Sequence, residues 1–176
     1  IQSGSDRVLS SMKRNYTVLE YKSIIRKLKK ACPDISITSD FIIGFPNETK
    51  DEFEQTKKLM KEINFDYSFS FLYSPRPGTP ASFIKDNITK QEKERRLKEF
   101  QKINITQGKG HTLKMIGTTQ RILIDRQSKR KEGVYLGKTD NNRVVEIQGG
   151  PELLNKFVTI KITNITEKNL EGFVIK

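Results

Sequence analysis

The stretch SDFIIGFPNET, residues 39–49, decides the fold of the first part of the chain. Its apolar run from Phe41 to Ile43 ends at Gly44, which is typical of a strand that is buried at its C-terminal end. Residues 49–52, Thr-Lys-Asp-Glu, then form a capping box, in which the hydroxyl and the carboxylate bind free amide groups at a helix start. The stretch therefore predicts a strand, a turn and a helix in succession.

Helices and strands alternate on both sides of this stretch. Residues 17–20 form another capping box, whose helix ends at Pro33, and residues 89–92 form a third, which opens a long charged helix. Between them, residues 65–73 alternate aromatic with mostly polar side chains, which predicts a second strand. The apolar faces of the first two helices comprise Tyr21, Ile24, Ile25, Leu28, Phe53, Thr56, Met60 and Ile63. This alternation predicts an α/β unit with parallel strands.

The pattern changes behind the charged helix. Short β-runs with turn residues between them follow at residues 122–124, 134–136, 144–147, 157–162 and 170–175. Five short strands in about sixty residues predict a small closed or nearly closed barrel of the OB type. The sequence therefore predicts two domains, an α/β unit over residues 1–111 and an all-β unit over residues 112–176.

The α/β unit is short of strands for a complete barrel. It holds two clear strands and, at most, the stub of a third before Gln2. A β/α barrel buries its parallel strands only when the sheet closes, so this unit should leave open edges and an uncovered apolar face. We therefore expect either that the chain is a portion of a longer protein or that a partner supplies the remainder.

Composition limits the classes of partner and site. The chain has 33 Lys and Arg against 21 Asp and Glu, a net charge of +12, which favours an anionic partner such as nucleic acid over a merely solvated basic surface. A single cysteine, Cys32, excludes an internal disulfide and a four-cysteine site, and its place at a helix end suggests a buried apolar residue. Without a signal peptide or long apolar run, a reducing cytoplasmic location is expected.

Three segments are candidates for a functional site. They are residues 2–9 with residues 12–14 close behind, residues 39–49, and residues 73–81. Each follows a strand or precedes a helix, and in a β/α barrel the loops after the strands form the active-site face. Each also has a plain structural interpretation, respectively a tight turn that caps a helix, a chain reversal, and a loop stiffened by prolines.

In this order and spacing, the three segments resemble the radical S-adenosylmethionine (SAM) methylthiotransferases that modify tRNA. In that family the barrel is followed by a TRAM domain, a small OB-like β-barrel that binds tRNA. The resemblance covers essentially the whole chain. It implies the C-terminal part of a radical SAM β/α (TIM-like) barrel over residues 1–111 and a TRAM domain over residues 112–176.

The resemblance also shows what the sequence lacks. Family members hold two [4Fe–4S] clusters, one on a Cys-x3-Cys-x2-Cys motif in the first barrel loop and one on three cysteines of an N-terminal domain. Cys32 matches neither motif. The chain therefore looks truncated at the fourth barrel strand, and it is not expected to cleave SAM by itself.

By resemblance, the first two segments bind SAM. Residues 2–5 would lie near its ribose, where Gln and Ser side chains bond hydroxyls and Gly permits close approach. Arg14 would pair with the SAM carboxylate, unless it is only an exposed cation near a helix end. Residues 43–46 would lie against the adenine. The expected cofactor contacts are Gln2, Ser3, Gly4, Ser5, Arg14, Ile43, Gly44, Phe45 and Pro46.

RNA contacts are expected on the third segment and on the all-β unit. Tyr73 and Arg76 lie in the last rim loop, where a phosphate or the target base could meet them. Residues 112–176 hold 12 basic and 7 acidic side chains, a net of +5, which suits salt-dependent phosphate contacts. The expected contacts in this unit are Arg121, Arg126, Lys129, Arg130, Lys138 and Arg143.

Three functions remain open from the sequence. The resemblance favours the branch of the family that methylthiolates isopentenyladenosine beside the anticodon. Relatives act on threonylcarbamoyl-adenosine or on a ribosomal protein. Because the cluster cysteines are absent, an RNA-binding remnant without catalysis is the alternative from another class.

Overall fold

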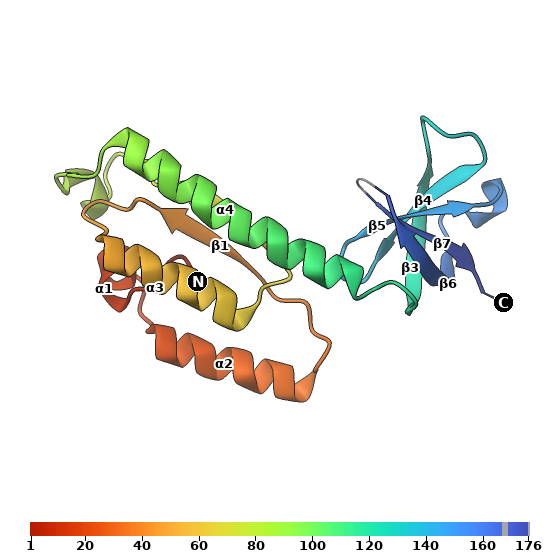
Figure 1. Cartoon of the computed structure of the whole chain (residues 1–176), viewed down its shortest axis with the longest axis horizontal. Coiled ribbons are helices and arrows are strands. Elements are labelled where there is room, and N and C mark those ends of the chain that lie inside the picture. Colours follow the sequence, from red (N-terminus) through yellow and green to blue (C-terminus); the bar gives the residue numbers. More distant parts are fainter. Residues whose placement is uncertain (167–168, 176) are drawn as a thin grey trace. The chain divides into compact units, whose positions relative to one another are not determined.

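The computed structural model describes residues 1–166 and 169–175, and the chain forms two compact units that divide between Gly108 and Lys109 (Figure 1). The division falls within α4 (Lys90–Leu113). The boundary predicted after residue 111 lies in the last turn of the same helix.

The first unit is a parallel two-stranded sheet with helices packed on one face. Its pairing runs from Thr38 opposite Tyr67 to Ile43 opposite Leu72. The first residues run alongside β1, where the amide of Ile42 donates to the carbonyl of Gln2 at 3.0 Å. In chain order the elements are α1 (Asp6–Ser11), α2 (Val18–Ala31), β1 (Thr38–Ile43), α3 (Lys50–Ile63), β2 (Tyr67–Leu72), the 3₁₀ turn η1 (Pro80–Phe83) and α4.

The core of this unit surrounds Phe41 of β1. Its ring centroid lies 5.5 Å from that of Phe65 and 4.8 Å from that of Phe100 of α4. The apolar face predicted for α3 is confirmed, since Phe53, Thr56, Met60 and Ile63 are all buried. The face predicted for α2 is only partly buried. Ile25 joins the core, whereas Ile24 and Leu28 are 55% and 41% exposed.

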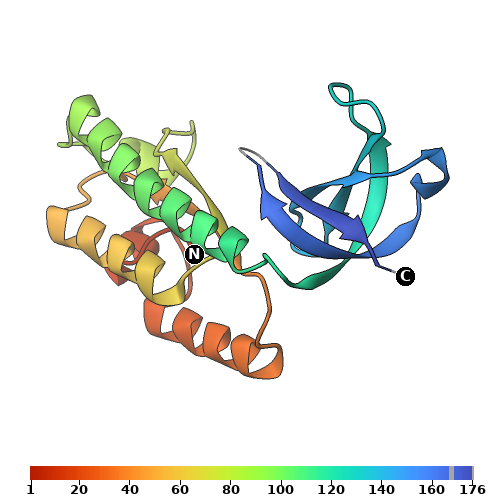
Figure 2. The same cartoon turned by 45° about the vertical axis from the view of Figure 1, so that its right-hand side comes forward.

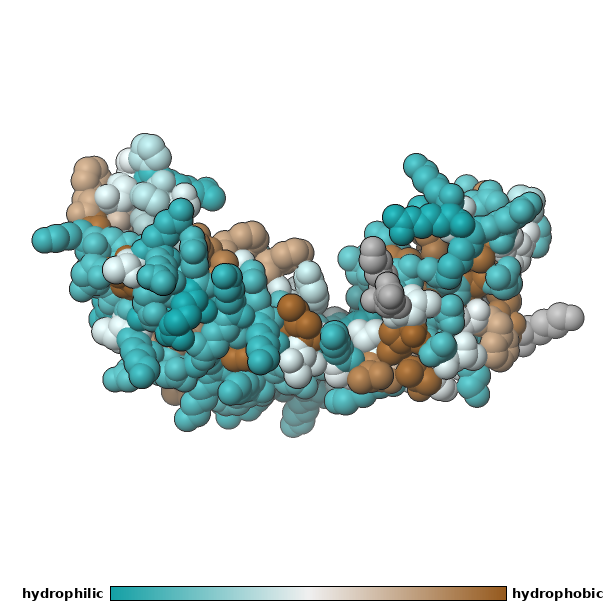
Figure 3. Space-filling view, turned by 45° about the horizontal axis from the view of Figure 1, so that its top comes forward, coloured by the Kyte–Doolittle hydropathy of each residue, from teal (hydrophilic) through white to brown (hydrophobic). Residues whose placement is uncertain are grey.

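The aromatic side chains of β2 lie on the face opposite the core. Tyr67, Phe69 and Phe71 are each more than half exposed, whereas Ser68 between them is buried. The side chain of Asn104 donates to the Ser68 carbonyl, so the polar side of β2 is the side covered by α4. The uncovered apolar face expected for an incomplete barrel is therefore present, and Figure 3 shows hydrophobic patches among the hydrophilic residues of the surface.

Two of the three predicted capping boxes are complete. Thr17 accepts from the Glu20 amide, and the Glu20 carboxylate accepts from the Thr17 amide; Thr49 and Glu52 do the same at α3. At α4 only half of the box forms. The Thr89 hydroxyl accepts from the Glu92 amide, but the Glu92 carboxylate is held by two arginines of its own helix.

The cap of α2 gives a modest stability prediction. Replacing Thr17 by Ala removes the acceptor for the Glu20 amide and should destabilise the first unit by about 1 kcal/mol. Urea unfolding followed by circular dichroism measures this as a lower midpoint. Thr106→Ala is the control, since that exposed hydroxyl bonds only a carbonyl within α4. Equal midpoints for the two variants would contradict the prediction.

The second unit is a closed barrel, as predicted from its short β-runs (Figure 2). The strands are β3 (Thr119–Gln127), β4 (Val134–Thr139), β5 (Val144–Gln148), β6 (Phe157–Ile165) and β7 (Leu170–Val174), with the 3₁₀ turn η2 (Pro151–Leu153) before β6. They pair in the order β3-β4-β5-β7-β6, with β6 returning to β3. Side chains at alternate positions fill the interior, including Ile122, Ile124, Val145, Ile160 and Ile162.

The lone cysteine, Cys32, is exposed, which corrects its expected burial. Pro33 ends the helix there, and the thiol lies beyond the packed part of α2.

No helix within residues 1–166 and 169–175 combines the length and apolar character needed to cross a bilayer.

Candidate functional site

The three singled-out segments meet at one rim of the sheet. Because β1 and β2 are parallel and Ile43 lies opposite Leu72, the loops that follow them leave the sheet side by side. The amide of Tyr73 donates to the carbonyl of Ile43 at 2.9 Å. Residues 1–3 run beside β1 in the same direction, so the segment that leads into α1 leaves at this end too.

The Ser3–Ser5 segment is held against α3. The Ser3 hydroxyl lies 3.3 Å from the hydroxyl of Thr56, and the Gly4 amide donates to that same oxygen at 2.9 Å. A β-carbon on Gly4 would lie 2.5 Å from the Gln55 carbonyl oxygen, so only glycine permits this approach. Ser3 is 0% and Ser5 2% exposed. The structure thus uses these side chains to fix the segment, and not to leave hydroxyls open for a ribose.

Gln2 and Arg14 remain accessible near this rim. Gln2 is half-buried, and its side-chain oxygen accepts from the Tyr16 hydroxyl at 2.8 Å. Arg14 is exposed, and its amide donates to the Leu9 carbonyl just beyond α1. Among the SAM contacts predicted in the first segment, these are the side chains that a ligand could still contact.

The loop between β1 and α3 buries its apolar side chains. Ile43 and Phe45 are 0% and 2% exposed, Pro46 is buried, and the Phe45 ring meets the Tyr73 ring edge-on at 5.0 Å. Gly44 has φ +71°, which favours glycine and allows the sharp turn out of β1. The apolar side-chain wall expected for an adenine is therefore part of the core, and the loop offers a ligand its main chain instead.

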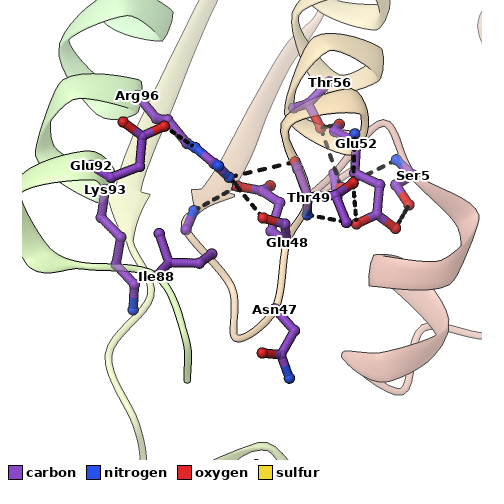
Figure 4. Close-up of polar contacts among 12 residues, drawn as sticks. Ser5, Asn47, Glu48, Thr49, Glu52, Thr56, Ile88, Glu92, Lys93 and Arg96 are labelled. Carbon is purple, nitrogen blue, oxygen red and sulfur yellow. Dashed lines mark hydrogen bonds and ion pairs between the residues drawn. The ribbon is translucent and has the colours of Figure 1, made fainter. Parts of the chain in front are cut away.

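A buried ion pair closes this loop against α4 (Figure 4). Arg96 donates to the Glu48 carbonyl at 2.8 Å and to its carboxylate oxygen Oε2 at 3.2 Å, which also accepts from the Gly44 amide. Within the described residues, Oε1 of Glu48 has no hydrogen-bond partner. Burial raises the pKa of Glu48, and the Gly44 amide and Arg96 oppose that shift. Arg96 is fixed on its other side by Glu92.

A second carboxylate, Glu52, joins two of the rim segments (Figure 4). Its Oε1 accepts from the Ser5 hydroxyl at 3.0 Å, and its Oε2 accepts from Arg7 at 2.6 Å and from the Thr49 amide at 2.8 Å. Arg7 also donates to the carbonyl of Asn47. The hydrogen bond from Arg7 is the main cause that lowers the pKa of Glu52 to about 2. Glu52 therefore stays charged and ties α1, α3 and the loop before α3 together.

The loop after β2 presents the predicted substrate contacts. Tyr73 is half-buried, and within the described residues its hydroxyl has no hydrogen-bond partner. The ammonium of Lys93 lies 5.9 Å from the centre of its ring. Arg76 is exposed three residues further on, and its carbonyl accepts from Thr79. Both residues are thus placed beyond the C-terminal end of β2, on the rim.

The predicted basic residues of the barrel fall into two groups. In and just before the loop between β3 and β4, Lys129 and Arg130 are exposed, and Arg126 at the end of β3 pairs with Asp125 at 2.8 Å. On the strands, Lys138 is exposed and the Arg121 guanidinium lies 4.1 Å from the centre of the Phe157 ring. Arg143 stands apart from both groups, since its side chain donates to the Thr112 hydroxyl.

Comparison with known proteins assigns both units. The family model of the radical SAM superfamily matches residues 1–60, and that of the TRAM domain matches residues 113–175. The chain thus carries part of a radical SAM domain, followed by a TRAM domain. The first match lies on the unit with the parallel sheet, and the second lies on the closed barrel.

Curated relatives match the radical SAM unit and the TRAM domain together. A protein of Methylobacillus flagellatus is 53% identical over 99% of this chain, and proteins of Yersinia pestis and Yersinia pseudotuberculosis are 49% identical over all of it. Each is named tRNA-2-methylthio-N(6)-dimethylallyladenosine synthase. The chain spans 37–40% of the length of these relatives and corresponds to their C-terminal part.

The radical SAM unit does not fit an iron–sulfur cluster by itself. Among residues 1–166 and 169–175, no three His, Cys, Asp or Glu side chains gather in a group that could hold a metal. Cys32 lies before β1, at the end of the strands opposite the rim. No step is therefore assigned to a cluster on this chain.

Sequence reasoning missed most of the polar residues that shape the rim of the radical SAM unit. Glu52 was detectable only as part of a capping box, which gave no sign of its bonds to Ser5 and Arg7. Arg96 gave no signal, because its partner Glu48 is 48 residues away in the sequence. The pattern of a charged helix is the same whether one of its arginines is exposed or buried.

Proposed function

We propose that this chain is the SAM- and tRNA-binding portion of an enzyme that methylthiolates C2 of N6-isopentenyladenosine next to the anticodon of tRNA. The observation that carries the proposal is the 49–53% identity, over essentially the whole chain, to relatives named for that product. The convergence of the three segments on one rim, with a basic barrel behind them in the sequence, supports it. A cytoplasmic location follows from a tRNA substrate.

The rim suits SAM through a small set of its residues. Gln2 and Arg14 would supply side-chain contacts, and the main chain of residues 43–46 would line the nucleoside. The Tyr73 hydroxyl is buried and has no hydrogen-bond partner among the described residues, so it could donate a hydrogen bond to a ligand at this rim. Ser3, Gly4 and Ser5 would act by holding the segment on α3. When bound beside a cluster held by the rest of the parent protein, SAM supplies the radical and the methyl group.

A second function is favoured by one observation, the lack of a cluster site among the described residues. An RNA-binding module without catalysis needs only the barrel and its basic side chains. Relatives that act on threonylcarbamoyl-adenosine or on a ribosomal protein differ from the first proposal in substrate alone.

Nucleoside mass spectrometry of tRNA separates these functions. Deleting the gene should remove the methylthio group from isopentenyladenosine and leave the isopentenyl nucleoside to accumulate. Loss of the methylthio group from threonylcarbamoyl-adenosine would assign the other tRNA branch. Unchanged nucleosides, together with tRNA binding by the purified chain, would establish the RNA-binding module.

The loop between β3 and β4 gives a prediction for tRNA affinity. Replacing exposed Lys129 and Arg130 together by Ala should weaken tRNA binding and lower the slope of log affinity against log salt by about 2, one for each phosphate that is no longer neutralised. Fluorescence anisotropy at several salt concentrations measures both effects. Lys27→Ala with Lys30→Ala on α2 removes the same charge and should leave the slope unchanged. Equal slopes for both double variants would contradict the prediction that this loop contacts tRNA phosphates.

A further inference from the structure

We propose that the outer face of β3 and β6 is a stacking platform for an unpaired nucleotide, with Phe157 under the base and three unneutralised cations on the same face. This inference rests on the proposed tRNA binding and deepens it. It adds a site for a nucleobase to a barrel whose basic loop suits phosphates.

Phe157 has the geometry of such a platform. It is the first residue of β6, and it remains 58% exposed, outside the buried core of the barrel. The Arg121 guanidinium lies 4.1 Å from the ring centre, so one face of the ring is covered and its orientation is fixed. The other face is left for a flat partner, and base stacking on an aromatic ring is worth about 1–3 kcal/mol.

The strand register places two further cations on the same face of the sheet as this ring. Leu123 lies opposite both Phe157 and Lys138, and Lys161 lies opposite both Thr119 and Phe173. Directly opposed residues share a face of the sheet, so the exposed members form one continuous surface. Its members are Thr119, Arg121, Leu123, Lys138, Phe157, Thr159, Lys161 and Phe173, and along β3 it is bordered by exposed Asp125, which pairs with Arg126. We call this surface the strand platform.

The cations of the strand platform are not neutralised by the protein. Within residues 1–166 and 169–175, Arg121, Lys138 and Lys161 form no ion pair with a carboxylate. By contrast, Arg126 near the end of β3 pairs with Asp125, and Lys131 in the β3–β4 loop pairs with Glu146. Free cations on the same face as an exposed aromatic ring suit the phosphates and a base of a short single strand.

The chemistry of the platform selects an unpaired nucleotide over a duplex. Bases in a duplex are already stacked on their neighbours, and only their edges and the backbone remain accessible. The pocket beside the β3–β4 loop is lined by four basic residues, by Glu146, Leu136 and four uncharged polar residues, so it offers cations to phosphates but no aromatic ring to a base. We therefore expect the pocket to bind the RNA backbone and the strand platform to bind a base.

The absence of tryptophan from the sequence permits a direct test. Phe157→Trp in the full chain introduces a single tryptophan at the platform. Its fluorescence should be quenched on titration with a single-stranded RNA, because a stacked base quenches indole emission. A duplex of the same sequence and inorganic polyphosphate should bind the cations without comparable quenching. Phe83→Trp, on a side chain 83% exposed in the other unit, is the matched control and should respond to none of them.

An affinity series completes the test. Phe157→Leu keeps an apolar side chain but removes the ring, and it should weaken single-stranded RNA binding about ten-fold, whereas Phe157→Tyr should retain wild-type affinity. Circular dichroism should show both variants folded, since the side chain is exposed.

Each remaining outcome has a definite meaning. Equal quenching by polyphosphate, or unchanged affinity of Phe157→Leu, overturns the platform and leaves the proposed tRNA binding intact. If the wild-type chain binds no tRNA even at low salt, the proposed function fails and the platform with it. Emission changes that follow protein concentration and not RNA would assign the face to a protein contact and reject the nucleotide.

Discussion

Replacing Arg96 by Met should destabilise the radical SAM unit by about 3–5 kcal/mol, the cost of removing one partner of a buried ion pair. Only 7% of the Arg96 side chain and none of the Glu48 side chain is exposed to solvent. The substitution keeps most of the volume over the Phe53 ring, which the Arg96 guanidinium overlies at 5.5 Å. It leaves the Glu48 carboxylate buried with the Gly44 amide as its remaining donor.

Urea unfolding followed by circular dichroism measures this loss in the helical transition of the first unit. Arg95→Met is the matched control on the same helix, because Arg95 is 55% exposed and solvent screens its pairs with Glu92 and Glu99, so the loss should be small. Adding Glu48→Gln to Arg96→Met should recover part of the lost stability, since the buried charge is then removed. Equal losses for Arg95→Met and Arg96→Met would contradict a buried ion pair.

Stability of the same unit should fall in acid because of Glu52. Its pKa lies at about 2 in the folded chain against an ordinary value of 4.5. A carboxyl whose pKa is lowered by folding stabilises the fold above its ordinary pKa and loses that contribution as the pH falls toward the folded value. From these two values, roughly 3 kcal/mol should be lost between about pH 5 and pH 2. The Ser5, Arg7 and Thr49 donors are the physical source of this energy.

The comparison of wild type with Glu52→Gln isolates this contribution. The variant should be less stable at neutral pH and should show a flatter dependence on pH below about 5. Glu48 acts in the opposite sense, because burial raises its pKa, but it is present in both proteins and cancels in the difference. Glu62→Gln is the control, since that carboxylate is exposed and pairs only with Lys22 and its neighbours. A parallel pH dependence for wild type and Glu52→Gln would disprove the role of Glu52.

The sequence by itself determined the elements and their order. The caps at Thr17 and Thr49, the strand that ends at Gly44 and the alternation in the barrel all depend on residues within four positions of one another. Hydrogen bonds and side-chain periodicity at that range are set by local chain geometry, so spacing alone predicts them. The same local stretches, read in order, carried the resemblance to the family.

Only the tertiary structure decided what the side chains of those elements do. Ser5 meets Glu52 across 47 residues, Arg96 meets Glu48 across 48, and Arg121 meets Phe157 across the β3–β6 pair. The exposure of Ile24 and Cys32 was equally hidden, because burial depends on what packs over a residue. Spacing fixes which side of a helix or strand a residue occupies, whereas the path of the folded chain fixes which group it meets there.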